Sequence, residues 1–139
     1  MIVLALDVGK KRIGMALSDP LGVIATGIPT LERQTLAWDL EQIQKIASER
    51  KVQRIVLGLP LHLDGRMGKE AQEMLVFKDE IHDKTRLPVE MFDERWTTVQ
   101  AEKSLLEGDL SRKKRKERID RIAAQLILQG YLERMRSAV

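Results

Sequence analysis

The hydrophobic and polar positions along the chain predict an alternation of strands and helices. Apolar runs, continuous or alternating, indicate strands, and apolar residues that recur every three or four positions indicate helices. The predicted strands cover residues 2–8, 13–18, 23–31, 52–58 and 87–93. The predicted helices cover about residues 35–50, 69–84, 97–107 and 119–136.

This order of elements predicts an α/β fold with a mixed five-stranded sheet flanked by helices. The turn at residues 9–12 is short enough to join the first two strands as an antiparallel hairpin. The later strands are separated by helices, which is typical of parallel crossover connections. Gly27 and Pro29 place the third strand at an edge of the sheet. The length of 139 residues predicts one domain over residues 1–139.

Positive charge is concentrated in one segment. The chain carries 24 lysines and arginines, 21 aspartates and glutamates, and a formal charge of +3. Residues 112–118 read RKKRKER and carry +5, so the rest of the chain is slightly acidic. A dense basic run before a predicted helix favours contact with phosphates, although a solvated, flexible loop without a partner fits the same pattern.

The composition limits the chemistry that a site could use. There are no cysteines and only two histidines, which excludes disulfides, thiolate nucleophiles and multi-histidine metal sites. Any catalytic metal would be held mainly by carboxylates, which favours Mg²⁺ or Mn²⁺.

No apolar run is long enough for a membrane span, and the start of the chain does not resemble a signal peptide. We therefore expect a soluble, cytoplasmic protein.

Acidic residues occur at three places that lie within or beside predicted apolar surfaces. Asp7 interrupts the first apolar strand, Asp93 and Glu94 end the last one, and Asp120 borders the apolar face of the final helix. A buried carboxylate is costly unless it is paired, hydrogen-bonded or bound to a cation. Each position also has an ordinary interpretation: a turn residue for Asp7, a strand-end cap for Asp93, a partner of Arg95 for Glu94, and a first-turn helix acid for Asp120.

Taken together, these acids indicate a convergent carboxylate cluster. Strand carboxyl ends are where open α/β sheets bind ligands. The small residues Ala123 and Ala124 would let the final helix approach the sheet closely. Such a cluster supports two-metal cleavage of phosphodiester bonds, because the carboxylates allow two divalent ions to lie close together.

The ordered motifs resemble the YqgF family, also called RuvX, over residues 2 to about 132. They are LDVGKKRIG at 6–14, SD at 18–19, GLP at 58–60 with DG at 64–65, DER at 93–95 with TT at 97–98, and ID at 119–120 with AA at 123–124. The chain has His62 where the family commonly has Asn, and Trp96 where it commonly has Leu. Neither difference is at one of the acids, so the implied catalytic residues are unchanged. Both differences affect the expected contacts of the loops with a substrate.

The resemblance implies a ribonuclease H-like three-layer fold and a metal-dependent nuclease, similar to the RuvC Holliday-junction resolvases. It implies processing of the 5′ end of pre-16S rRNA, with ribosomal particles as a partner. By position, Asp7, Glu94 and Asp120 look like the catalytic and metal-binding acids, with Asp93 as the alternative to Glu94. The expected nucleic-acid-binding residues are Lys10, Lys11, Arg12, Arg95, Arg112, Lys113, Lys114, Arg115 and Lys116.

Several alternatives stay open at this stage. Branched DNA is an alternative substrate to pre-rRNA, because a basic run reads phosphates and not sugars. A non-catalytic RNA-binding module is a second possibility. A nucleotide-binding protein of the actin and sugar-kinase type is a third, although such proteins close two lobes over the nucleotide and this chain provides length for one. Arg95 either contacts phosphate or holds Glu94.

Overall fold

The computed structural model describes residues 1–96 and 112–137, with the side chains of 96 and 112–117 left out. Its elements are β1 (Val3–Val8), β2 (Arg12–Ser18), β3 (Ala25–Glu32), α1 (Leu36–Glu49), β4 (Arg54–Leu59), α2 (Lys69–Thr85), β5 (Val89–Asp93), the short 3₁₀ helix η1 (Glu94–Trp96) and α4 (Arg112–Ser137). The five predicted strands are confirmed with shifts of one or two residues at most ends. The predicted helix at residues 97–107 lies outside the described residues.

The strands form one mixed sheet in the order β3-β2-β1-β4-β5. β1 pairs with β2, and β2 with β3, in antiparallel register, whereas β1, β4 and β5 are parallel. The predicted hairpin and the edge position of β3 are both confirmed. Because β1, β4 and β5 run in the same direction, their carboxyl ends meet at one edge of the sheet, next to the β1–β2 turn.

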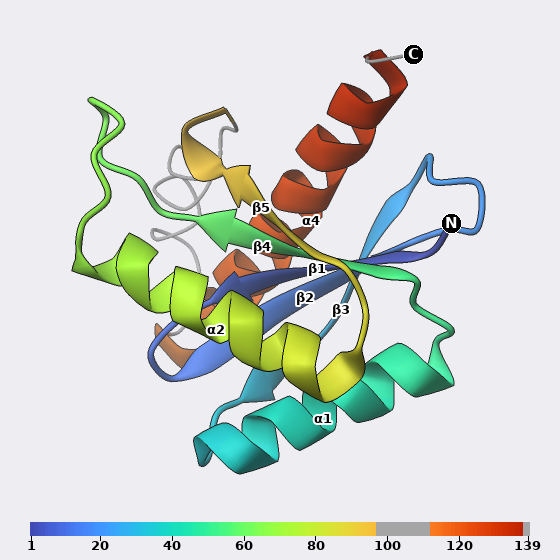
Figure 1. Cartoon of the computed structure of the whole chain (residues 1–139), viewed down its shortest axis with the longest axis horizontal. Helices are drawn as coiled ribbons and strands as arrows, with labels where there is room; N and C mark the ends of the chain where they lie inside the picture. Colours follow the sequence, from blue (N-terminus) through green and yellow to red (C-terminus); the bar gives the residue numbers. More distant parts are fainter. Residues whose placement is uncertain (97–111, 138–139) are drawn as a thin grey trace.

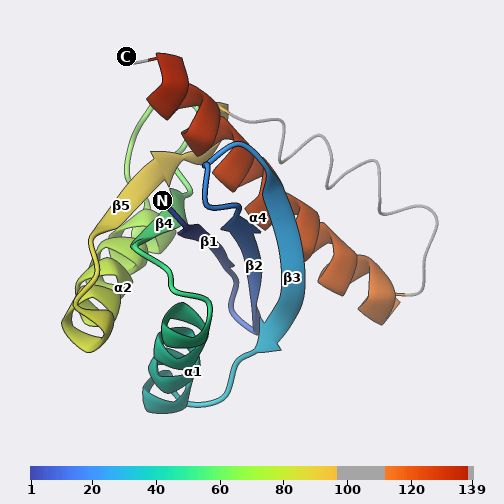
Figure 2. The same cartoon turned by 90° about the vertical axis from the view of Figure 1, so that its right-hand side faces the viewer.

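Helices cover both faces of the sheet. α1 and α2 lie side by side on one face, and α4 crosses the other (Figures 1 and 2). The α1/α2 face buries large aliphatic side chains such as Leu4, Leu6 and Ile55, whereas the α4 face buries Val3, Ala5 and other residues around them. This alternation along β1 is the period-two pattern of a strand that is covered on both faces.

Local sequence signals explain where the helices begin. The Thr35 side chain caps α1 by accepting a hydrogen bond from the Trp38 backbone N–H at 3.1 Å. α4 begins at Arg112, so the basic run is its first two turns and not a loop ahead of a helix beginning at Ile119. Lysine, arginine and glutamate are strong helix formers, which explains a helix in a segment without apolar periodicity.

The position of Asp120 is corrected in the same way. Since α4 begins eight residues earlier, Asp120 lies in the interior of the helix and not in its first turn. A stabilising contact with the helix dipole therefore does not account for this carboxylate, because that effect falls off within the first turn.

None of the helices in the described ranges is long and apolar enough to cross a membrane.

Candidate active site

Asp7 lies at the centre of the sheet, one residue before β1 ends. Its side chain is only 9% exposed. Val3 and Ala5, which precede it at alternate positions, belong to the core beneath α4, so Asp7 belongs to the same face. Two glycines flank it. Gly14 of β2 is its cross-strand partner, and Gly58 of β4 follows Leu57, which pairs with Leu6.

Gly58 leaves room for the carboxylate of Glu94. A Cβ atom added at Gly58 would lie 3.0 Å from Glu94 Oε1. β5 ends at Asp93, and Glu94 opens the short helix η1, so the chain turns at this point over the end of β4. The second acid is therefore placed next to Asp7 by a close approach that a larger residue at position 58 would obstruct.

Gly14 leaves room for Asp120 on the other side of Asp7. A Cβ atom at Gly14 would collide with the backbone carbonyl of Asp120 and would lie 3.1 Å from its Cβ atom. Ala123 and Ala124, one turn further along α4, are fully buried against the sheet. The close approach of this helix, predicted from its small residues, is confirmed.

A cleft of about 290 Å³ opens at the carboxyl edge of the sheet. Asp7 and Glu94 both line it. Asp120 lies over the neighbouring strand β2 and is not among the described residues that line the cleft. Within the described part of the chain, no three Asp, Glu or His side chains form a ready-made metal-binding group. The structure thus brings two of the predicted acids together in one cleft and places the third one strand away.

Two further carboxylates line the cleft that the sequence analysis missed. Glu70 and Glu73 come from the first turns of α2 and face the cleft of Asp7 and Glu94. Their spacing of three residues puts them on one face of the helix, and this signal is present in the sequence. What could not be read there is that α2 begins beside the end of β1.

Arg95 fixes Asp93 in an ion pair. Its Nη2 atom lies 2.6 Å from Asp93 Oδ2, and its Nε and backbone N–H also donate to the Asp93 carboxylate. These hydrogen bonds, first of all those from the Arg95 side chain, hold the pKa of Asp93 below its usual value, and the pKa of Arg95 is raised. The Asp93 carboxylate is therefore already engaged by a cation from its own chain.

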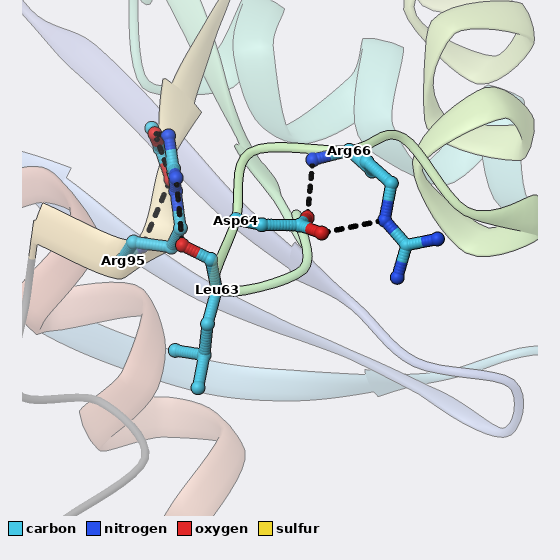
Figure 3. Close-up of polar contacts among 5 residues, drawn as sticks. Leu63, Asp64, Arg66 and Arg95 are labelled. Carbon is cyan, nitrogen blue, oxygen red and sulfur yellow. Dashed lines mark hydrogen bonds and ion pairs between the residues drawn. The ribbon is translucent and has the colours of Figure 1, made fainter.

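The same arginine ties the loop after β4 to β5. Arg95 Nη1 donates to the Leu63 carbonyl at 3.2 Å (Figure 3). The loop is also closed internally: the Gly65 N–H donates to the His62 carbonyl, and Asp64 accepts from the Arg66 backbone and side chain. The turn predicted at Asp64-Gly65 is confirmed, with Gly65 at a φ of 90°. These hydrogen bonds therefore define the conformation of the loop after β4, which borders the site.

A model of the RuvX family, described as Holliday junction resolvase, matches residues 1–134. The chain belongs to the RuvX family. A relative from Clostridium kluyveri, provisionally named pre-16S rRNA nuclease, is 48% identical over 135 residues, which are 97% of this chain and 98% of the relative. A Clostridium botulinum relative of the same name is 47% identical over 133 residues, covering 96% and 97% of the two chains.

Solved structures resemble this RuvX-family protein at low identity. Thermus thermophilus RuvC in complex with a Holliday junction substrate has a TM-score of 0.59 at 12% identity, covering 99% of this chain and 97% of that one. The fowlpox virus Holliday junction resolvase has a TM-score of 0.56 at 13% identity, covering 96% and 99%. These likenesses confirm the predicted ribonuclease H-like fold. Membership of the family confirms the predicted enzyme class, a nuclease that hydrolyses phosphodiester bonds.

The predicted nucleic-acid-binding residues have different surroundings in this RuvX-family protein. Lys10 and Lys11 are exposed on the β1–β2 turn. Arg12 instead lies against β3, where its Nε atom is 2.9 Å from Glu32 Oε1. Arg112, Lys113, Lys114, Arg115 and Lys116 form the start of α4, and their side chains lie outside the described residues.

Proposed function

We propose that this RuvX-family protein is a metal-dependent endonuclease that cleaves precursor 16S rRNA, as the provisional names of its relatives suggest. Its place of action is the cytoplasm, and its substrate is the precursor RNA in ribosomal particles. The observation that carries the proposal is the arrangement around Asp7, where Gly14 and Gly58 let two further acids approach the buried carboxylate from both sides. A fold that needed only a stable core would have no use for carboxylates at these three neighbouring positions.

Asp7, Glu94 and Asp120 are the proposed metal-binding and catalytic residues. Their oxygen donors suit the hard cations Mg²⁺ and Mn²⁺, and the acidic lining of the cleft by Asp7, Glu94, Glu70 and Glu73 supports cation binding there. Bound divalent ions would supply a hydroxide nucleophile and stabilise charge on the phosphate oxygens. Asp7 contributes a carboxylate whose position is fixed by burial in the central strand.

The structure favours Glu94 over Asp93 as the ligand. Asp93 is engaged by Arg95 through several hydrogen bonds, and a metal ion would compete with that guanidinium. The Glu94 carboxylate instead leans over Gly58 and lines the cleft that contains Asp7. In this arrangement Arg95 and Asp93 fix the start of η1 and thereby the direction of Glu94.

The proposal is tested with an RNA that spans the mature 5′ end of 16S rRNA, with Mg²⁺ or Mn²⁺ present. We expect Asp7→Asn and Glu94→Gln each to lower the cleavage rate by at least about 100-fold, because each removes a charged ligand of the same centre. Asp93→Asn is the matched control, and we expect a loss of less than about tenfold, because it weakens a positioning contact only. Cleavage by Asp7→Asn at the parent rate would refute the proposed centre.

A second candidate function is resolution of branched DNA, which the family description and the likeness to RuvC favour. The same preparation is therefore offered a four-way DNA junction and the precursor RNA in parallel. Cleavage of the junction alone would assign the protein to DNA. Binding of RNA without cleavage of either substrate, and without divalent-metal binding in a titration, would identify a non-catalytic RNA-binding module.

A further inference from the structure

A second hollow of about 550 Å³ adjoins the cleft of Asp7 and Glu94. It lies between the β1–β2 turn, the end of β3 and the beginning of α1. The cleft and this hollow share two lining residues, Lys10 and Arg33, so the two spaces meet along these side chains. The other lining residues of the hollow are Lys11, Glu32, Gln34, Leu36 and Asp39.

The two hollows differ in charge. The cleft is lined by four carboxylates, those of Asp7, Glu94, Glu70 and Glu73, which outnumber the two cations that it shares with the second hollow. Both acids of the second hollow are already paired with arginines: Glu32 with Arg12 at 2.9 Å, and Asp39 with Arg33 at 3.0 Å. The exposed Lys10 and Lys11 therefore give the second hollow a net positive charge.

Arg33 is held rigidly where the two spaces meet. Its Nε atom donates to Asp39, whose carboxylate is buried and also accepts the Gln34 backbone N–H at 2.9 Å. Its Nη1 atom donates to the Gly9 carbonyl at 2.9 Å, and its guanidinium lies 5.4 Å from the centre of the Phe77 ring. One arginine thus connects the β1–β2 turn, α1 and α2, and it fixes the turn that carries both lysines.

We propose that this hollow binds the nucleotide next to the scissile one, with Lys10 and Lys11 contacting its phosphate. The inference rests on the proposed nuclease function and deepens it. When the scissile phosphate of an RNA strand lies in the acidic cleft together with the metal ions, the neighbouring phosphate of that RNA lies outside the metal site. A positively charged surface is then required to bind this second phosphate. The hollow supplies that charge within one connected groove, and Arg33 keeps it in a fixed position beside the acids.

Lys11 is the residue to test, because it is exposed and lines the second hollow but not the cleft. We expect Lys11→Ala to weaken binding of the precursor RNA by about three- to tenfold and to lower the slope of log affinity against log salt by about 1. Lys45→Ala, which removes an exposed lysine in the middle of α1, is the charge-matched control and should change neither quantity. Binding is measured by fluorescence anisotropy with Ca²⁺, a hard divalent cation that suits the carboxylates of the cleft, and thermal melting verifies that both variants fold.

A set of RNAs that each carry one neutral methylphosphonate linkage near the cleavage position locates the contact. At one linkage adjacent to the scissile bond, the neutral group should weaken binding to the parent protein more than it weakens binding to Lys11→Ala, in which only Lys10 still contacts the phosphate. The inference is overturned if Lys11→Ala binds the precursor RNA as tightly as Lys45→Ala does. It is also overturned if the difference in affinity between the parent protein and Lys11→Ala is the same whichever linkage is neutral. Cleavage is scored separately with Mn²⁺. A parent protein that binds without cutting refutes the nuclease function, and the binding results still decide the subsite.

Discussion

The two faces of the sheet are built from side chains of different size. Against α1 and α2 the strands bury large aliphatic residues, among them Leu4, Leu6 and Leu57, which are 0% exposed. Against α4 the strands present small residues at several positions, Ala5, Ala16, Gly14, Gly27 and Gly58, beside the larger Val3, Val56 and Phe92. The first face is built for burial of apolar area. The second is built for close approach, and it is the face that carries the acids.

The largest effect on stability is expected on the α1/α2 face. Leu4→Ala removes a fully buried side chain on the face of β1 opposite to Asp7 and should lower the free energy of unfolding by about 2–5 kcal/mol. Well below the melting temperature of the variant, we expect the cleavage rate to remain close to that of the parent. Urea unfolding and a nuclease assay measure the two quantities. If folded Leu4→Ala loses cleavage activity, the α1/α2 face contributes to catalysis as well as to stability, and the comparison of the two faces is wrong.

A smaller loss of stability with a larger loss of activity is expected on the α4 face. Gly14→Ala places a methyl group against the Asp120 carbonyl, which cannot move away without shifting α4, so we expect a cost of about 1–3 kcal/mol. Displacement of Asp120 should lower the cleavage rate by at least about tenfold.

Gly27→Ala is the matched control on the same face. Its added methyl group would meet Arg121 Cγ at 2.5 Å, and this side chain belongs to an exposed residue that can turn aside. We expect little change in cleavage. Equal effects of the two substitutions would mean that the approach of α4 at Gly14 has no special part in the chemistry.

The smallest effect concerns the polar contacts at the far end of α4. The Asp19 carboxylate accepts backbone hydrogen bonds from Ile24, Val23 and Leu21, and the Gly22 carbonyl in this loop accepts one from Arg136 of α4. The hydrogen bonds, that from Ile24 first, lower the pKa of Asp19 from its ordinary 3.8. A lowered pKa stabilises the folded state above 3.8, and this contribution is lost as the pH falls through the folded-state pKa. Asp19→Ala should therefore lower the melting temperature slightly at neutral pH, and the difference should shrink in acid.

Most of the sheet was predictable because its strands carry strong local signals. The apolar run of β1, the turn at Gly9 and the edge residues Gly27 and Pro29 each correspond to what the structure shows. The start of α4 was not predictable from apolar periodicity. Its first two turns contain charged residues only, so nothing in the hydrophobic pattern distinguishes a helix from a loop there.

The candidate site was predictable in its acids and not in its surroundings. Asp7 and Glu94 stand out because carboxylates at the ends of apolar strands are unusual. Arg33, Glu70 and Glu73 carry no such signal, since charged residues at the starts of helices or after strands are ordinary in sequence. The start of α2 brings Glu70 and Glu73 to the cleft of Asp7, and the hydrogen bond of Arg33 to the Gly9 carbonyl brings Arg33 there.

The contact of α4 with β2 at Gly14 joins two segments that lie far apart in the chain. The β1–β2 hairpin is local in sequence, whereas α4 follows every strand of the sheet in the chain, so its contacts with β1 and β2 span a long sequence separation. Contacts of large sequence separation form slowly, because loop-closure entropy opposes them. Docking of α4 is therefore expected among the late steps of folding, and it is the step that brings Asp120 over Gly14, the cross-strand partner of Asp7.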